Sequence, residues 1–406
     1  MKLPRLNLAH PLIIYTAAWL LVLFLVGLQL TVNLPPINDS TLILVLSNII
    51  SFWLIYLFLL PAYPRGRSKS TRDISPQVML RLKRFVKGLL VFWTVSIAFE
   101  VIYAGGVPLM WALSGNIEKS YVDFGIPTFH GLLNSIYFFS ITALFLDFVV
   151  SKRRQSLFLV MMLLMWPVVA FARSVLMGAL CQMAGVYLLL HRVSLSTLLK
   201  LLLVVLVIIW AFGWIGDLRG TPDPFANLVD SRYQETISQL PTGFLWFYVY
   251  LTSPLGNIIS NIDVVQPTYF PYYSIANLVP TALRGVIMPE IVRPDDLELV
   301  VANLNVSTFY AGFLSDYGVI GSIVSVAVLQ VFIVIVYFYA KRKKVWAILA
   351  YAVLFQSIVF SVFYNLLSSQ VYLIQIVIAL YFGSRVKRLS AAHSVQPSPT
   401  IEMAET

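Results

Sequence analysis

Arginine is nearly the sole cation in three polar parts of this apolar chain, namely the stretches 105–131 and 216–317 and the short break F-A-R-S, where Lys119 is the one lysine. Four of these arginines are Arg173 in F-A-R-S, Arg219 in G-D-L-R-G, Arg284 in T-A-L-R-G and Arg293 in I-V-R-P-D-D. A planar guanidinium forms two parallel hydrogen bonds with a phosphate or carboxylate group, which a lysine ammonium cannot do. We therefore expect this set to bind an anion. The alternative for any single arginine is pairing with one of the neighbouring acids.

A fifth arginine begins a regular spacing. The stretch D-S-R-Y-Q-E-T-I-S-Q-L-P-T-G places Arg232 and Gly243 with ten residues between them. It carries no lysine. We expect Arg232 to join Arg173, Arg219 and Arg284 around one polar cavity.

His130 is the residue best suited to proton transfer. It stands in D-F-G-I-P-T-F-H-G, seven positions after Asp123. A neutral imidazole can take a proton from a hydroxyl group near neutral pH, and a nearby carboxylate such as Asp123 could serve instead. The alternative is a histidine that only hydrogen-bonds to backbone. With four histidines in the whole chain and scattered acids, no spacing is typical of a metal site, and no nucleotide-binding loop is present.

Composition assigns the chain to the membrane. Of its 406 residues, 59% are hydrophobic and only 11% are charged, against about 25% charged residues in a soluble domain. We expect an all-α polytopic membrane protein. The net charge of +10 then reflects membrane topology rather than binding to nucleic acid. The single cysteine excludes an internal disulfide.

Ten apolar segments are long enough to be considered as spans. They are 12–31, 41–61, 86–104, 132–150, 157–172, 175–190, 199–215, 318–340, 345–364 and 369–384. The fifth and sixth are separated only by F-A-R-S, so they form either a tight hairpin or one irregular element. Arg173 in this break is expected to face a polar cavity, with snorkelling to the headgroups as the alternative.

The basic residues set the expected orientation. If the N-terminus is cytoplasmic, 22 of the 28 Lys and Arg residues lie inside, which is what cytoplasmic loops prefer. Both termini are then inside and residues 1–390 form one integral membrane domain. Its outer loops are 105–131 and a large one at 216–317, between the seventh and eighth spans. Residues 244–256 of the large loop predict a membrane-lying aromatic helix that ends near Pro254 and Gly256. The polar tail 391–406 predicts disorder.

These features together resemble the Wzy-type bacterial O-antigen and capsule polymerases, within the O-antigen ligase and polymerase superfamily. The resemblance rests on the number of spans, the arginine after the fifth span, the R-x10-G spacing of Arg232 and Gly243, and G-G-V-P-L with D-F-G-I-P-T-F-H-G in the loop 105–131, the second outer loop of the chain. Two further stretches also agree: Y-L-T-S-P-L-G-N in the large loop and N-V-S-T-F-Y-A-G-F-L-S-D-Y-G-V-I-G before the eighth span. A second R-x10-G spacing is missing, because Arg293 reaches a glycine only at Gly312.

The resemblance implies a GT-C-type, metal-independent glycosyltransferase of the bacterial inner membrane that takes part in polysaccharide or lipopolysaccharide biosynthesis. Its substrate would be an oligosaccharide repeat unit linked to undecaprenyl pyrophosphate, on the periplasmic face. The growing glycan would leave its lipid and join a sugar hydroxyl of a new lipid-linked unit. His130, Arg232 and Asp123 would be catalytic. Pyrophosphate or substrate binding would fall to the remaining residues of the set, Arg173, Arg219, Arg284, Arg293 and Gly243.

The expected partners and the alternative functions follow from the same resemblance. The expected partners are the lipid-linked oligosaccharide, membrane lipid and, as a candidate, a chain-length regulator. No cofactor is expected. An O-antigen ligase shares the chemistry and differs in the acceptor. A flippase or other transporter would need charges buried along several spans, whereas the predicted spans hold few acids, Glu100 and Asp147.

Labelling from outside the cell tests the predicted topology. In a chain without Cys181, single cysteines placed within 220–235 should react with a membrane-impermeant maleimide in intact cells. Cysteines placed within 64–85 should react only after the membrane is opened, because basic loops stay in the cytoplasm. Labelling of the 64–85 positions in intact cells would overturn the orientation.

Overall fold

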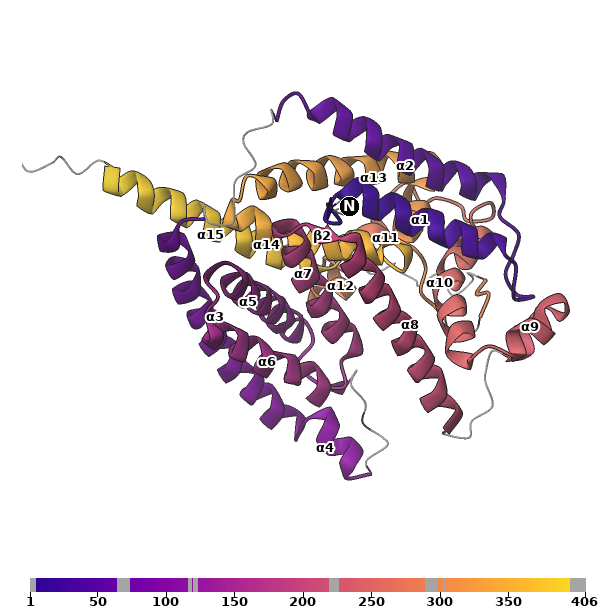
Figure 1. The fold of residues 1–406 in the computed structure, drawn as a ribbon, viewed down its shortest axis with the longest axis horizontal. Helices are drawn as coiled ribbons and strands as arrows, with labels where there is room; N and C mark the ends of the chain where they lie inside the picture. The colour runs from indigo at the N-terminus through magenta and orange to yellow at the C-terminus, as the bar shows by residue number, and fades with distance from the viewer. Residues whose placement is uncertain are drawn as a thin grey trace, which may run out of the picture. The chain divides into compact units, whose positions relative to one another are not determined.

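The fold is almost entirely helical in a computed structural model (Figure 1). The structure describes residues 5–63, 74–115, 119, 123–218, 226–288, 298–301 and 304–394. Its longer helices are α1 (Pro11–Gly27), α2 (Asp39–Leu59), α3 (Pro76–Ala104), α5 (Phe129–Ser151), α6 (Arg154–Val169), α7 (Arg173–Leu190), α8 (Leu195–Leu218), α10 (Thr242–Asn261), α13 (Ala311–Lys341), α14 (Val345–Val359) and α15 (Gln370–Ser394). The shorter elements are α4 (Pro108–Leu113), α9 (Gln234–Ser238), α11 (Tyr272–Ile275), α12 (Thr281–Ile287), the 3-10 turns η3 (Ala226–Leu228), η4 (Ser231–Tyr233), η5 (Phe360–Val362) and η6 (Leu366–Ser368), and a two-residue ladder of β1 (Arg5–Leu6) with β2 (Val193–Ser194).

Each of the ten predicted spans coincides with one long helix, α10 being the additional one. Within the described residues, six helical segments are long and apolar enough to cross a membrane: Asp39–Leu59, Pro76–Leu113, Phe129–Ser151, Arg173–Leu190, Ala311–Lys341 and Val345–Val362. Helices α1 and α6 are apolar but shorter. The chain is therefore a membrane-embedded helical protein.

The fifth and sixth predicted spans form a hairpin. Helix α6 ends at Val169 and α7 begins at Arg173. Between them Phe171 adopts a left-handed φ of 53°, and the Ala172 N–H donates to the Pro167 carbonyl at 2.8 Å. The turn is closed by backbone hydrogen bonds, which excludes the single irregular element.

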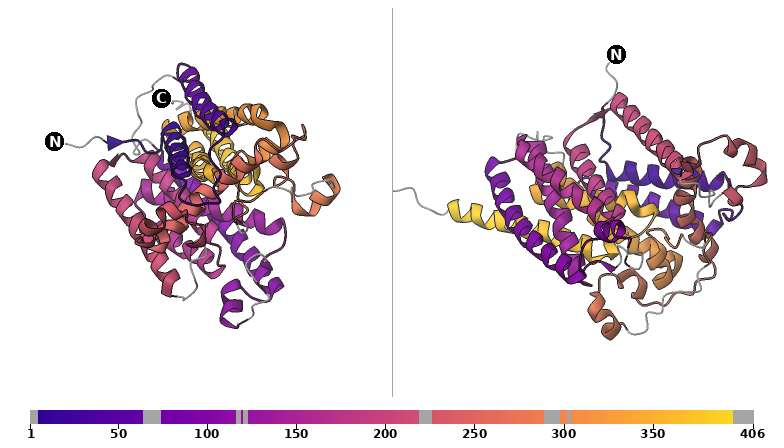
Figure 2. Two further views of the ribbon diagram at one scale, coloured as in Figure 1. Left: turned by 90° about the vertical axis from the view of Figure 1, so that its right-hand side faces the viewer. Right: turned by 90° about the horizontal axis from the view of Figure 1, so that it is seen from below.

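The chain divides into two compact units. Unit 1 comprises residues 1–65, 187–338 and 354–372, and unit 2 comprises 66–186, 339–353 and 373–406. In unit 2, α5 packs between α3 and α6 and is buried along most of its length (Figures 1 and 2). Apolar residues surround the whole circumference of α5, which is the pattern of a helix at the centre of a bundle.

In unit 1, α10 is packed between protein helices and is longer than the sequence predicted. It lies against α8 and α1, and only part of its aromatic surface, at Phe247 and Tyr250, is exposed. The predicted end near Pro254 and Gly256 is wrong, because α10 continues to Asn261. Burial of one face of α10 outweighs the hydrogen bond that proline removes. Gly256 is needed for packing, since an added Cβ would come within 2.8 Å of Leu34.

Two asparagines on α10 hold the irregular backbone that precedes α13. Asn257 donates to the carbonyls of Leu304 and Val306, at 3.0 Å each, and accepts from the Val300 N–H at 2.9 Å. One turn later, Asn261 exchanges two hydrogen bonds with the backbone of Glu298. Buried backbone groups need such partners where no helix or sheet supplies them.

A buried carboxylate ties the next part of unit 1 together. Asp316, on the first turns of α13, is fully buried and accepts hydrogen bonds from the backbone N–H groups of Tyr273 and Ser274, at 2.8 Å each, and from the Ser274 hydroxyl. Two residues later Gly318 has φ 66° and ψ −169°, a conformation open in practice only to glycine. Helix α13 therefore breaks at Gly318, which is where the sequence predicted the eighth span to start.

The C-terminal helix extends beyond its predicted span. Helix α15 runs to Ser394, so residues 391–394 of the predicted disordered tail are helical. Residues 395–406 lie outside the described part of the chain. The last turns of α15 carry Arg385, Lys387 and Arg388, residue types that favour the C-terminal end of a helix.

Candidate functional site

His130 of unit 2 is held by a buried carboxylate. It is the second residue of α5, and its Nδ1 lies 2.7 Å from Oε2 of Glu100, near the C-terminal end of α3. The Glu100 side chain is 0% exposed and that of His130 is 16% exposed. The imidazole therefore has one nitrogen fixed inside the protein, while its edge still reaches the surface.

The same carboxylate organises the loop that leads to His130. Its other oxygen, Oε1, accepts a hydrogen bond from the Ile126 N–H at 3.0 Å. The His130 N–H in turn donates to the Ile126 carbonyl at 2.8 Å. Glu100 thus uses both oxygens to join α3, the loop and the start of α5.

Gly125 is required for this arrangement. Its φ is 93°, which side chains other than hydrogen rarely tolerate, and an added Cβ would lie 2.6 Å from Nδ1 of His130. Thr128, immediately before α5, also has a positive φ, of 72°. The tight conformation explains why D-F-G-I-P-T-F-H-G contains a glycine and a proline between two aromatic residues.

Aromatic rings surround the pair on one side. Phe124 meets the His130 imidazole edge-on, with 5.5 Å between ring centroids, and also contacts Trp111 of α4 and Trp166 of α6. Nζ of Lys119 lies 5.0 Å from the centre of the Trp111 ring. The result is an apolar wall with a cation at its edge, beside an imidazole that reaches the surface.

The geometry defines what His130 can do. A carboxylate at Nδ1 favours the tautomer with the proton on Nδ1, which leaves the lone pair of Nε2 free to accept a proton. The carboxylate also stabilises the imidazolium that forms when Nε2 takes that proton. Among the described residues, Nε2 has no protein hydrogen bond. The arrangement suits a general base for a hydroxyl group.

Glu100, which the sequence analysis did not assign to the site, is the carboxylate that contacts His130. Asp123 is exposed in the turn before Phe124. The signal that could have identified Glu100 is its presence in an otherwise apolar span. An acid at such a position needs a partner, and His130 is the outer-loop histidine.

Arg173 lies at the same end of unit 2 as His130. It is the first residue of α7, four positions after Val169, which packs against the cluster of Val107, Trp111 and Phe124. The Arg173 side chain is exposed and forms no ion pair among the described residues. Its guanidinium is therefore available to an anion.

Arg284 in unit 1 has one guanidinium nitrogen that lacks a hydrogen-bond partner in the described part of the chain. It lies on α12, and its Nη2 reaches Oδ1 of Asn277 at 3.4 Å, a long hydrogen bond. Its Nε is buried with no hydrogen-bond partner among the described residues. A buried guanidinium nitrogen without an acceptor is costly, so this position favours an incoming anion.

Arg232 already has a carboxylate partner. Its Nε and Nη2 reach the two oxygens of Asp230 at 3.0 and 2.9 Å, in an exposed turn. These hydrogen bonds lower the pKa of the Asp230 carboxyl and raise that of Arg232. Gly243 is buried in the first turn of α10, beyond the short helix α9. No described hydrogen bond joins Arg232 to Gly243 or to Arg284.

Two predicted site residues lie outside the described residues, namely Arg219 and Arg293. The expected single cavity lined by Arg173, Arg219, Arg232 and Arg284 stays a prediction. Within the described part of the chain, no group of three or more His, Cys, Asp or Glu side chains could hold a metal ion.

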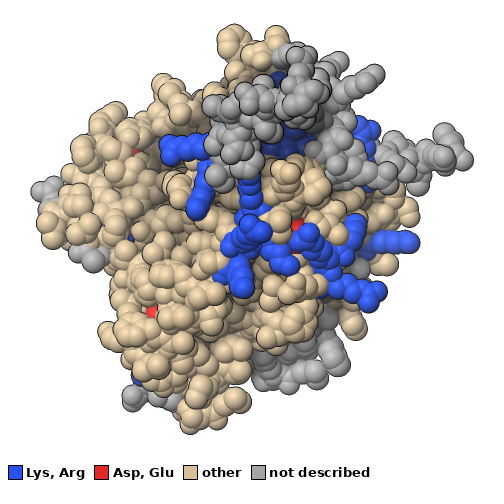
Figure 3. Space-filling view, turned by 90° about the vertical axis from the view of Figure 1, so that its left-hand side faces the viewer, with Lys and Arg blue, Asp and Glu red and all other residues tan. Residues whose placement is uncertain are grey.

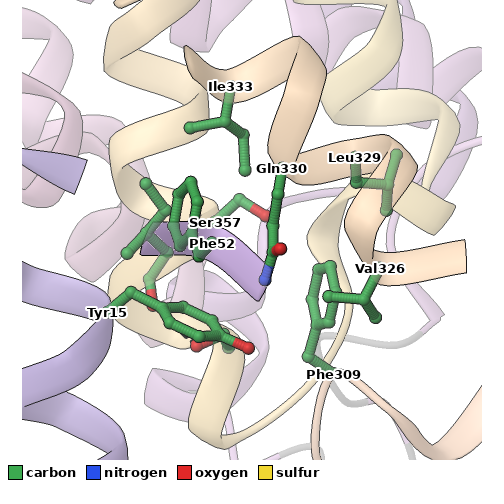
Figure 4. A pocket seen from close by; sticks show the side chains of 10 residues that line it. Tyr15, Phe52, Phe309, Val326, Leu329, Gln330, Ile333 and Ser357 are labelled. Atoms are coloured by element: carbon green, nitrogen blue, oxygen red, sulfur yellow. Dashed lines mark hydrogen bonds between the residues drawn. The ribbon is translucent and has the colours of Figure 1, made fainter. Parts of the chain in front are cut away.

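A narrow apolar cavity in unit 1 is separate from these residues (Figure 4). Its polar atoms come from Tyr15, Gln330, Ser357 and Ser361 among apolar side chains. The Tyr15 hydroxyl bonds to the Tyr310 hydroxyl at 2.7 Å, and the Ser51 hydroxyl donates to Gln330 at 2.8 Å. These contacts connect helices, and the cavity holds no carboxylate, imidazole or cation. We assign it no part in catalysis.

Comparison with known proteins identifies no relative: no family model, no curated protein and no solved structure matches the chain.

A pair of glycine substitutions tests the packing around His130. Gly125→Ala introduces both backbone strain and a clash with the imidazole, and should destabilise the protein by about 2–4 kcal/mol. Gly115→Ala is the matched control, because Gly115 also has a positive φ, of 69°, but open space around it. That control should cost only about 1–2 kcal/mol of backbone strain. Thermal unfolding in detergent measures both variants, and equal losses would contradict the described contact between Gly125 and His130.

Proposed function

We propose that the protein is a membrane glycosyltransferase that polymerises lipid-linked oligosaccharide repeat units. The observation that carries the proposal is the Glu100–His130 pair, a surface-reaching base fixed by a buried carboxylate. Polymerisation needs such a base, because the attacking group is a sugar hydroxyl that must lose its proton. The fold class, a helical membrane protein, is compatible with a lipid-linked substrate.

In the proposed reaction, the acceptor hydroxyl attacks the anomeric carbon of the growing glycan. A glycosidic bond forms as the bond from that carbon to the lipid pyrophosphate breaks. The pyrophosphate leaves with the bonding electron pair, and the hydroxyl proton passes to Nε2 of His130. Attack from the face opposite the leaving group inverts the configuration at the anomeric carbon.

A buried aromatic cluster lies behind the base. Trp111 and Phe124 are only 5% and 4% exposed, so they hold the imidazole in place and do not themselves offer a surface to a sugar. Lys119, which is exposed at the edge of this cluster, supplies a hydrogen-bond donor. We assign the exposed edge of His130 and Lys119 to the acceptor sugar.

Arginines supply the positive charge that the leaving group requires. In the proposal, Arg173 of unit 2 contacts phosphate oxygens of a lipid pyrophosphate. Arg284 of unit 1, whose buried Nε has no hydrogen-bond partner among the described residues, is a separate candidate for binding phosphate. Donors aimed at developing negative charge are typically the largest single contribution to catalysis. Arg232 is the weaker candidate, because binding a phosphate would require its release from Asp230. The proposal places this chemistry on the periplasmic side of the bacterial inner membrane.

A reconstituted assay distinguishes the proposed polymerase from a ligase and from a flippase. Purified protein in liposomes, supplied with one lipid-linked repeat unit, should produce a ladder of glycan lengths. A single transfer to a different acceptor would identify a ligase. Translocation without a new glycosidic bond would identify a flippase. Either of the last two results overturns the polymerase.

Substitutions of the pair test its role in that assay. His130→Ala should lower the rate of polymerisation by about 100- to 10,000-fold, the usual contribution of a general base. Glu100→Gln tests the role of the pair more specifically, because it leaves His130 in place. The glutamine amide would donate a hydrogen bond to Nδ1, so the imidazole proton would lie on Nε2, which could then no longer accept a proton. This substitution should lower the rate by a similar factor, about 100- to 10,000-fold.

Asp263→Asn, which makes the same kind of change at an exposed acid of unit 1, is the control and should leave the rate of polymerisation unchanged. His130→Gln separates positioning from proton transfer, since glutamine can hydrogen-bond but cannot accept the proton. Full activity of His130→Gln would reduce His130 to orienting the acceptor. Loss of activity in Asp123→Asn but not in Glu100→Gln would assign the base to Asp123.

Lysine substitutions test the binding of pyrophosphate. Arg173→Lys and Arg284→Lys keep the positive charge but lose the two-pronged geometry, and each should lower the rate by about 100-fold. Arg192→Lys is the matched control, because Arg192 is an exposed arginine outside the proposed site. Protein level and unfolding temperature are measured in parallel. Normal rates for both test variants would remove the arginines from the mechanism.

A further inference from the structure

Unit 2 carries a dense set of basic residues at the end opposite to His130. They come from four segments: the start of α3, the α5–α6 turn, the α13–α14 turn and the last part of α15. The residues are Arg81, Lys83, Arg84, Lys87, Lys152, Arg153, Arg154, Lys341, Arg342, Lys343, Lys344, Arg385, Lys387 and Arg388. We call this set the basic face. Figure 3 shows Lys and Arg side chains crowded together with very few acidic atoms among them.

Contacts between the four segments show that the basic face is continuous. Phe85 on α3 packs against Phe382 on α15, with ring centroids 5.7 Å apart. Trp346, at the start of α14, lies so close to Gly383 of α15 that an added Cβ would meet its ring at 2.8 Å. Nζ of Lys83 donates to Oε1 of Gln155 on α6 at 2.8 Å. Each basic segment is therefore anchored to a neighbour.

Few of the carboxylates that the structure describes in unit 2 lie near this charge. The described acids of unit 2 are Glu100, Asp123 and Asp147, and only Asp147 lies at this end. Asp147 is 2% exposed and accepts hydrogen bonds from Ser151 and Ser156. Its charge is used to close the α5–α6 turn rather than to pair with the basic face.

Topology alone does not account for the concentration of charge. The positive-inside preference asks for Lys and Arg in each retained loop. In unit 1 the described residues that serve this purpose are few: Arg5, Arg192 and Lys200. Unit 2 holds a several-fold larger set, and burial together with the nearby Lys341 ammonium lowers the pKa of Lys343. So close a set of like charges favours binding of an anion.

Helix lengths place the basic face at the depth of lipid headgroups. Helix α3 has 29 residues and is therefore about 43 Å long, against about 30 Å for the hydrocarbon core of a bilayer. The excess lies at its basic first turns if the apolar part, which begins near residue 86, spans the core. Helix α15 likewise has its apolar residues first and its basic residues in the turns that follow.

We propose that the basic face of unit 2 is a binding surface for anionic phospholipid headgroups of the surrounding leaflet. Clusters of several Lys and Arg residues directly beside membrane helices attract such lipids, and basic recesses between helix ends retain them. The arginine and lysine side chains contact the lipid phosphates, while the adjacent apolar helix surfaces contact the acyl chains. The proposal does not rest on the proposed enzymatic function.

Lipid titration measured by native mass spectrometry tests the proposal. The purified full-length protein is delipidated in detergent and titrated with phosphatidylglycerol or with phosphatidylcholine of the same acyl chains. Phosphatidylglycerol should bind at least about tenfold more tightly, and its affinity should fall as salt is raised, because exposed charges are screened. Equal affinity for both lipids, or no effect of salt, overturns the proposal and leaves an acidic protein as the occupant of the face.

Matched double substitutions locate the binding. Arg385→Gln with Arg388→Gln should lower the phosphatidylglycerol affinity by about fivefold for each charge removed. Arg192→Gln with Lys200→Gln removes the same charge from exposed residues of unit 1 and should leave it unchanged. If the first variant does not fold, Lys341→Gln with Lys344→Gln removes two exposed charges from another segment and should give the same loss. Equal losses in the test and control variants would show that binding follows net charge and not the basic face.

Discussion

The buried carboxylate of Glu100 makes the contacts on which the turn before α5 depends. A charged group with no exposure must have its oxygens satisfied, and here one oxygen takes a backbone N–H and the other an imidazole. Because these two partners, Ile126 and His130, lie only four residues apart, Glu100 fixes the turn that leads into α5. The positive φ of Gly125 and the position of the Phe124 ring follow from that closure.

Unit 1 satisfies its irregular backbone in a related way, with two asparagines and one carboxylate. Its irregular segment before α13 runs beside helices and cannot rely on water, so Asn257 and Asn261 supply alternating donors and acceptors to its backbone. Asp316 does the same for the start of α11. Both units therefore have non-helical backbone that is satisfied by polar side chains projecting from long helices. This arrangement allows loops to be ordered without a sheet of their own.

The positions of the long helices could be predicted from the sequence because apolar runs of the right length have few other structures available. The end of α10 could not be predicted, since Pro254 and Gly256 signal termination locally while packing against α8 and α1 decides the outcome. Local pattern likewise indicated that His130 was chemically special but not that Glu100 contacts it, because the two are 30 positions apart. Arg232 could be identified as a candidate from its spacing to Gly243. Its pairing with Asp230 could not be predicted, because it depends on the conformation of one exposed turn.

The break at Gly318 has a structural consequence. Asp316 and Ser315 precede the break, and they are hydrogen-bonded to Ser274, Tyr273 and Thr268 of the large loop. The long part of α13 follows the break, where the Ser322 hydroxyl donates to the Gly318 carbonyl and Pro267 lies beside the glycine. By their hydrogen bonds the first turns of α13 therefore belong to the large loop, and Gly318 lets the chain turn from that loop into the long helix without a separate connecting segment.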